Sequence, residues 1–77
     1  MKVKIYTTPS CKYCKMAKEY FDKLGIDSEE IDVTVNQEAL EEMVEKSHQM
    51  GVPVIEIGDE IFVGFNRSEI DKVLNQH

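Results

Sequence analysis

The chain has 77 residues, and its 42% share of hydrophobic side chains is that of a globular domain rather than a disordered segment. Nine basic and fifteen acidic residues give a formal net charge of −6, which argues against nucleic acid as a partner because phosphate contacts require a basic face. No stretch has the apolar length of a signal peptide or a membrane span. We therefore expect residues 1–77 to form one cytoplasmic domain, monomeric and without a membrane partner.

The first predicted strand covers residues 3–6 and leads into the loop that holds the only two cysteines, Cys11 and Cys14. A helix is predicted over residues 12–24, because apolar side chains recur there at helical spacing and Gly25 can end a helix. The side chains expected on its inward face are those of Cys14, Ala17, Tyr20 or Phe21, and Leu24.

The middle of the chain repeats this alternation of strand and helix. A second strand is predicted over residues 28–33, and the spacing of Thr34 and Gln37 is that of a capping box that starts a second helix. A third strand is predicted within residues 51–57. Pro53 is expected to be its first residue, because proline has no N–H to donate within a sheet.

The last part of the chain predicts a hairpin and a helix. A tight turn at residues 58–60 joins the third strand to a fourth over residues 61–63. Asn66, with Glu69 three residues later, is suited to cap a final helix. The order β-α-β-α-β-β-α indicates an α/β domain whose mixed sheet is covered by helices. Three methionines are predicted to fill the core: Met16, Met43 and Met50.

The spacing of Cys11 and Cys14 indicates a redox-active pair. A loop that leaves a strand and enters a helix places Cys11 near unpaired backbone N–H groups and the positive end of the helix dipole, which favour a thiolate. One helical turn brings Cys14 back beneath Cys11, where it can close a small disulfide. We predict that Cys11 is the nucleophile and that Cys14 is less exposed. Lys12 and Lys15 either help to stabilise the thiolate or form a solvated helix face that only aids solubility.

Two alternatives to redox catalysis are compatible with the same residues. A metal-binding or metallochaperone module could use the paired thiolates. A structural zinc site normally needs four ligands, and with only two cysteines, His48 and the terminal His77 the chain would have to dimerise or recruit ligands. No metal ligand is therefore assigned. A non-catalytic interaction domain would keep its partner when both cysteines are lost.

Three segments resemble the glutaredoxin-like branch of the thioredoxin-fold superfamily, which includes the NrdH-redoxins. They are Tyr-Thr-Thr-Pro-Ser-Cys-Lys-Tyr-Cys, Gly-Val-Pro-Val-Ile and Val-Gly-Phe-Asn, and the match runs essentially from end to end. The resemblance implies a thioredoxin-like fold with a four-stranded sheet of order 2-1-3-4, three helices and a cis peptide between Val52 and Pro53. It also implies a thiol-disulfide oxidoreductase that acts on disulfide-containing proteins or small molecules.

The resemblance further implies which residues bind the substrate. Val52 would offer its backbone, beside Pro53, to an extended peptide or to glutathione. The other residues expected in the binding site are Lys12, Tyr13, Gly64 and Phe65.

The electron donor is left open by the resemblance. No bound cofactor is expected, and electrons would come from glutathione or from thioredoxin reductase and NADPH. Phe65 stands where glutaredoxins usually carry a second glycine, and Arg67 stands near the position of an aspartate. These two residues are similar to the NrdH-redoxin group, whereas Lys12 and Tyr13 are closer to glutaredoxins.

Overall fold

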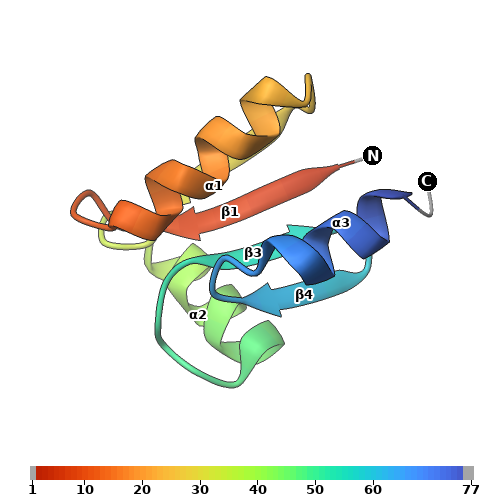
Figure 1. Cartoon of the computed structure of the whole chain (residues 1–77). Helices are drawn as coiled ribbons and strands as arrows, with labels where there is room; N and C mark the ends of the chain where they lie inside the picture. Colours follow the sequence, from red (N-terminus) through yellow and green to blue (C-terminus); the bar gives the residue numbers. More distant parts are fainter. Residues whose placement is uncertain (1, 76–77) are drawn as a thin grey trace.

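A four-stranded mixed sheet forms the centre of the chain in a computed structural model that describes residues 2–75 (Figure 1). The elements, in chain order, are β1 (Val3–Thr7), α1 (Lys12–Lys23), β2 (Ser28–Asp32), α2 (Gln37–Ser47), β3 (Val54–Ile57), β4 (Glu60–Val63) and α3 (Arg67–Asn75). The strand order is β2-β1-β3-β4; β1 and β2 are parallel and the other pairs are antiparallel. The predicted α/β class, element order and sheet order are confirmed.

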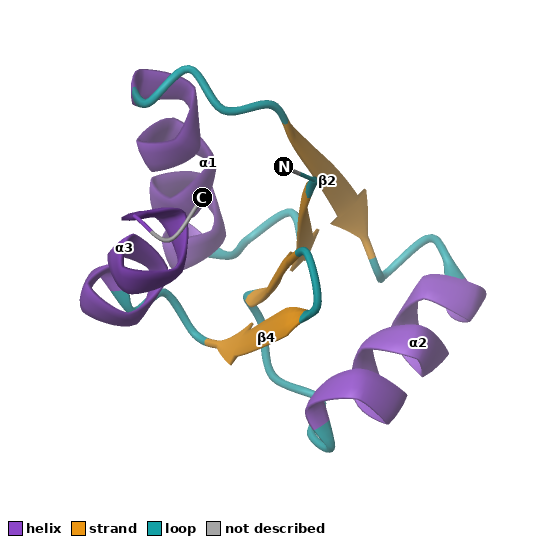
Figure 2. Cartoon of the chain, turned by 90° about the vertical axis from the view of Figure 1, so that its right-hand side faces the viewer, coloured by secondary structure: helices purple, strands orange, loops and turns teal. Residues whose placement is uncertain are grey.

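The helices form two layers, with α1 and α3 on one face of the sheet and α2 on the other (Figure 2). This division follows from the alternation of side chains along a strand. Ile5 of β1 belongs to the cluster under α1 and α3, while its neighbour Tyr6 belongs to the cluster under α2. Ile55 and Val54 of β3 divide in the same way.

Helix α1 ends as the sequence predicts, but one of its expected core residues is exposed. Gly25 adopts φ 72°, and the N–H groups of Gly25 and Ile26 donate to the carbonyls of Asp22 and Phe21, which closes the helix end. Phe21 is fully buried, whereas the prediction for Leu24 is wrong because it lies at the C-cap and is 48% exposed. The helix turns only its Cys14, Ala17 and Phe21 face toward the sheet.

Only one of the three methionines predicted to fill the core is buried. Met43 of α2 is fully buried and fills the core as predicted. Met16 is 43% exposed and Met50 is 69% exposed, so the prediction that they pack in the core is wrong. Met16 lies on the solvent side of α1, and Met50 lies in the segment between α2 and β3.

Helix α2 begins at a different cap from the one predicted. The N-cap is Asn36, whose Oδ1 accepts a hydrogen bond from the backbone N–H of Ala39 at 3.0 Å. Thr34 is instead held by Asp32, whose Oδ1 accepts from both the backbone N–H and the hydroxyl of Thr34. The prediction of a capping box at Thr34 and Gln37 is therefore wrong, because Thr34 is hydrogen-bonded to the Asp32 carboxylate in a turn that precedes the helix.

Strand β3 starts one residue later than expected. Pro53 lies before the strand rather than at its first position, and β3 begins at Val54. The carbonyl of Pro53 still accepts a hydrogen bond from the backbone N–H of Gly64 at 2.8 Å. The peptide between Val52 and Pro53 is cis, as the resemblance implies.

A polar network joins the sheet to α2. The phenol of buried Tyr6 donates to Glu42 Oε1 at 2.8 Å, and Lys46 bonds the same oxygen at 2.8 Å and both oxygens of Glu56 at 3.1 Å. Burial, with the hydrogen bond to Glu42, raises the pKa of Tyr6 to about 12. The hydrogen bond to Glu42 also raises the pKa of Lys46, and the bond from Lys46 lowers the pKa of Glu42.

This network predicts a loss of stability in alkaline solution. Because the folded state holds the proton of Tyr6 more tightly than the unfolded chain does, its contribution is complete below pH 10 and is lost as the pH rises toward about 12. Tyr6→Phe should lower the free energy of unfolding by about 1 kcal/mol near neutral pH and should flatten the alkaline loss. A residual slope should remain, since the raised pKa of Lys46 acts in the same direction.

Urea unfolding of both proteins at pH values on either side of 10 measures the effect. Tyr13→Phe is the matched control, because Tyr13 is 61% exposed. An alkaline slope unchanged in Tyr6→Phe would contradict the role given to this phenol.

Within residues 2–75, no helix is long and apolar enough to cross a membrane.

Candidate active site

The register of the sheet brings three loops to one end of the molecule. Tyr6 of β1 pairs with Val54 of β3, and Val54 pairs with Val63 of β4. The loop after β1, the segment before β3 and the loop after β4 must therefore meet at this end, as Figure 1 shows. They carry the cysteine pair, Val52 with Pro53, and Gly64 with Phe65 respectively.

Cys11 and Cys14 are joined by a disulfide, with their Cα atoms 5.3 Å apart. Cys11 is the N-cap of α1, and its backbone N–H donates to the carbonyl of Thr8 at 3.2 Å, which fixes the loop. Cys11 is half-buried, whereas Cys14 is only 1% exposed and its Sγ lies 4.0 Å from the Tyr6 carbonyl oxygen. The predicted difference in exposure between the two sulfurs is confirmed.

The N-terminal end of α1 provides a positive environment for Cys11. The backbone N–H of Cys14 donates to Cys11 Sγ at 3.2 Å, a bond that strengthens when the sulfur becomes a thiolate. The first turn of α1 contains no acidic residue that would neutralise the helix dipole. The geometry therefore favours negative charge on Cys11 rather than on the buried Cys14.

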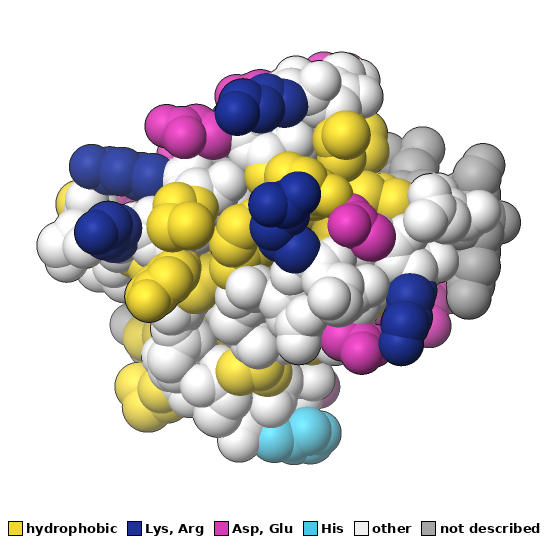
Figure 3. Space-filling view, viewed as in Figure 1, with side chains coloured by type: hydrophobic (Ala, Val, Ile, Leu, Met, Phe, Trp, Pro, Cys, Tyr) yellow, Lys and Arg dark blue, Asp and Glu magenta, His cyan; other side chains and the backbone are white. Residues whose placement is uncertain are grey.

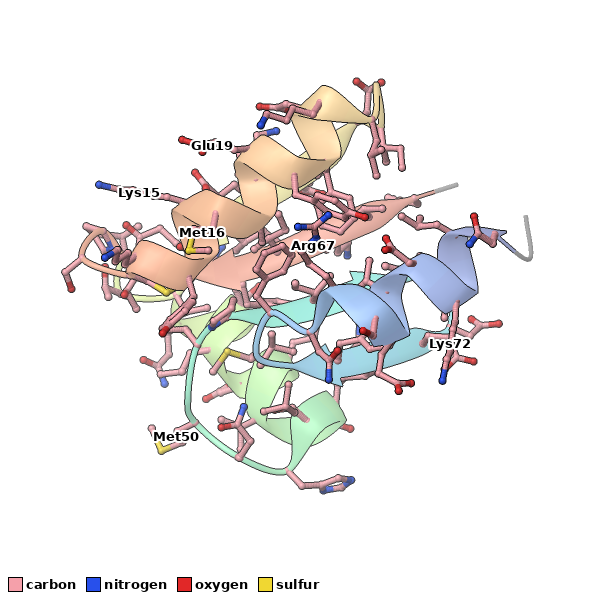
Figure 4. All side chains as sticks on the ribbon, in the orientation of Figure 1. Lys15, Met16, Glu19, Met50, Arg67 and Lys72 are labelled. Carbon is pink, nitrogen blue, oxygen red and sulfur yellow. A yellow bond between two sulfur atoms is a disulfide. The ribbon has the colours of Figure 1, made fainter. Side chains whose placement is uncertain are left out.

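The predicted lysines lie in different surroundings. Lys12 is exposed in the first turn of α1. Lys15 points away from the body of the helix in Figure 4, and it lines a pocket together with Glu30 and Asp32 of β2. Their effect on a Cys11 thiolate stays a prediction.

The segment around Pro53 is tied to the loop after β4. Pro53 is buried, Val52 is half-buried, and the bond from the Gly64 N–H to the Pro53 carbonyl connects the two segments. Gly64 has φ 85°, a left-handed conformation that side-chain-bearing residues rarely adopt, although open space surrounds the position of a Cβ. A glycine is needed here for its backbone conformation.

Tyr13 and Phe65 lie at the border of a surface groove. Tyr13 is 61% exposed, and half-buried Phe65 packs edge-on against Tyr20 with the ring centroids 5.7 Å apart. We call this surface the α1–α3 groove. Its lining residues are Tyr13, Met16, Glu19, Tyr20, Lys23, Phe65, Asn66, Arg67 and Ser68.

The sequence pattern did not identify Met16 and Tyr20 as groove residues, and Arg67 stood out only as a departure from glutaredoxins. One signal could have identified the first two. Tyr13, Met16 and Tyr20 follow helical spacing on a stripe different from the one that contains Cys14, Ala17 and Phe21. When a helix has two apolar stripes and only one packs in the core, the other stays on the surface and can form a binding site.

Within residues 2–75, no group of three or more histidine, cysteine or acidic side chains is placed to hold a metal ion. Both sulfurs are bonded to each other, so neither is available as a thiolate ligand in this state.

Comparisons with known proteins agree with this geometry. The glutaredoxin family profile matches residues 3–63. A glutaredoxin-like 8.6 kDa protein of the rubredoxin operon of Clostridium pasteurianum, described as uncharacterized, is 46% identical over 96% of this chain and 99% of its own length. A glutaredoxin of Neisseria meningitidis is 42% identical, covering 82% of this chain and 75% of its own.

A solved structure extends the comparison to the redoxins. NrdH-redoxin from Escherichia coli superposes with a TM-score of 0.81 and 30% identity, covering 95% of each chain. The chain therefore belongs to the glutaredoxin family, within the thioredoxin-fold group that contains glutaredoxins and NrdH-redoxins.

Proposed function

We propose that this protein is a thiol-disulfide oxidoreductase that reduces disulfides in other proteins. The observation that carries the proposal is the disulfide between half-buried Cys11, at the N-terminus of α1, and buried Cys14. A pair with one accessible and one protected sulfur suits an exchange reaction in which the two cysteines act in sequence.

The reaction has two exchange steps. The Cys11 thiolate attacks one sulfur of the substrate disulfide, so that a bond forms between Cys11 Sγ and that sulfur while the substrate S–S bond breaks. The released substrate thiolate takes a proton from water. Cys14, as a thiolate after losing its proton to water, then attacks Cys11 Sγ and releases the second substrate thiolate. Two electrons have passed to the substrate, and the protein is left with its Cys11–Cys14 disulfide.

A reductant must return two electrons to the pair after each cycle. We infer that the dithiol of a thioredoxin reductase, supplied by NADPH, is the preferred donor, and that two molecules of glutathione are the less effective one. Phe65 and Arg67 support this choice, together with the similarity to NrdH-redoxin, whose structure is described as explaining a thioredoxin-like activity profile.

The test compares the recovery of free thiols by the oxidised protein under two conditions. One contains thioredoxin reductase and NADPH, and the other contains glutathione, glutathione reductase and NADPH. We expect faster recovery in the first, and none in Cys11→Ser, which cannot form the disulfide. Faster recovery with glutathione would overturn the inferred donor but keep the oxidoreductase, whereas failure of both to reduce the protein would contradict the proposed cycle.

A further inference from the structure

The α1–α3 groove is an apolar surface that continues from the cysteine loop. Hydrophobic side chains gather between α1 and α3 around a basic side chain in Figure 3, and Figure 4 places Met16 and Arg67 in this area. Met16 is 43% exposed and Tyr13 is 61% exposed, although both side chains are large. Both lie in the N-terminal half of α1, shortly after Cys11. A partner whose disulfide reaches Cys11 would therefore also contact this groove.

Arg67 is held in the groove by aromatic packing. Its guanidinium carbon lies 4.7 Å from the centroid of the Tyr20 ring. Tyr20 is fixed in turn by Phe65 against its ring and by a hydrogen bond from its hydroxyl to Asp71. The position of the guanidinium is therefore preorganised by contacts within the protein.

Arg67 has no direct ion-pair partner in the part of the chain that the structure describes. Among residues 2–75, no carboxylate oxygen lies within 4.0 Å of its guanidinium, whereas four lysines have such partners. The nearby carboxylate of Asp71 accepts the hydroxyl of Tyr20. Glu19 and Lys23, which also line the groove, carry opposite charges, so Arg67 supplies its net positive charge. The planar guanidinium, with donors spaced to match two carboxylate oxygens, is suited to bind a carboxylate.

We propose that the α1–α3 groove is a specificity subsite for the substrate protein, in which Arg67 binds an acidic side chain and Met16 and Phe65 contact an apolar one. This inference rests on the proposed oxidoreductase function. The occupant is a segment of a disulfide-bearing protein, because the groove begins at Tyr13, two residues after Cys11. Its apolar surface and single net charge complement a segment that carries both kinds of side chain.

The length of α1 sets the position of the acidic residue. A helix rises about 1.5 Å per residue, so Cys11 and Tyr20 are separated by about 14 Å along the axis. Helical side chains lean toward the N-terminus, which shortens the path, and an extended peptide advances about 3.3 Å per residue. The acidic residue should therefore stand about three to four residues from the cysteine that Cys11 attacks.

Matched peptides test the charge. Each contains one disulfide and differs only in having Glu, Gln or Lys about four residues before or after the attacked cysteine. For the wild-type protein with excess donor, we expect kcat/KM to be about fivefold higher for the Glu peptide than for the Gln peptide in one of the two placements. Arg67→Gln should remove the difference, and Arg67→Glu should prefer the Lys peptide.

Two control variants separate the groove from general effects. Lys72→Gln makes the same change of charge on α3 but at the far end of the helix in Figure 4, and it should keep the preference for Glu. Met16→Ser should raise KM for peptides with an apolar residue between the cysteine and the acid. Met50→Ser should not, since Met50 is exposed and does not line the groove.

The outcomes distinguish failure of the proposed subsite from failure of the proposed oxidoreductase function. Equal kcat/KM for the Glu and Gln peptides would overturn the subsite and leave the oxidoreductase intact, whereas reduction of neither peptide would overturn both. An effect of Arg67→Gln confined to disulfides of glutathione would assign the groove to a small molecule and overturn the protein segment. Should Arg67→Gln fold poorly, salt provides the second measurement, because raising ionic strength must weaken the Glu preference of the wild-type protein.

Discussion

Cys14→Ser is expected to stop the reaction at a covalent complex between the protein and its substrate. Without the second thiolate, nothing within the chain can attack Cys11 Sγ once it has bonded to the substrate sulfur. The complex should accumulate as long as no external thiol is supplied, because only an outside thiol could then attack the mixed disulfide at half-buried Cys11. Mass spectrometry under non-reducing conditions should find the protein and one substrate joined by a single disulfide, and the addition of dithiothreitol should separate them.

The same experiment assigns the roles of the two sulfurs. Cys11→Ser should form no such complex and should lower disulfide reduction to the uncatalysed rate, because the remaining sulfur is 1% exposed. The two variants carry the same chemical change three residues apart, so a general loss of folding would affect both alike. Accumulation of the complex by Cys11→Ser instead would reverse the assignment of nucleophile and resolving cysteine.

Phe21→Ala should have the largest effect on stability. The Phe21 ring is fully buried in the cluster formed by α1, α3 and the sheet, and its removal leaves a cavity as well as less buried apolar surface. Such a change costs about 3 to 5 kcal/mol, a large part of the roughly 5 to 15 kcal/mol available to a small domain. Urea unfolding should show a much lower midpoint or a protein already partly unfolded in water.

Leu24→Ala is the matched control on the same helix. Leu24 belongs to the same helical pattern in the sequence but is 48% exposed, so its truncation should change the free energy of unfolding by about 0.5 kcal/mol or less. Comparable losses in the two variants would mean that α1 lies on the sheet through a different face from the one described here.

The sequence predicts the frame of the active site because local and long-range signals agree there. The strand before Cys11, the helix after it and the proline before β3 each have distinct residue patterns, and the resemblance supplies the order of the strands. Tyr6, Val54 and Val63 pair with one another across three neighbouring strands. The loops that follow β1 and β4 and the segment before β3 must therefore lie at the same end of the sheet. The sequence therefore predicts where Cys11 and Cys14 lie in the fold.

The errors arise where two side chains compete for one role. Thr34 and Asn36 can both cap α2, and only the bond between Thr34 and Asp32 decides which one does. Met16 is apolar like a core residue, but which of two apolar stripes on α1 faces the sheet depends on the packing of the helix. Leu24 follows the spacing of the buried stripe, yet it lies at the C-cap of α1, where it is exposed. The stacking of Arg67 on Tyr20 depends on a contact between helices far apart in the sequence, which no local pattern encodes.

The two stripes of α1 divide the requirements of the protein between separate sets of side chains. One stripe is buried against the sheet and contains Cys14, Ala17 and Phe21. The other stripe includes Tyr13 and Met16, which are exposed and do not pack in the core. Substitutions of Tyr13 and Met16 can therefore accumulate, or be introduced by an engineer, at little cost to the fold. Under the proposed function, a single domain of this size could thus be redirected to new disulfide proteins by changing a few surface positions, with the cysteine pair left as it is.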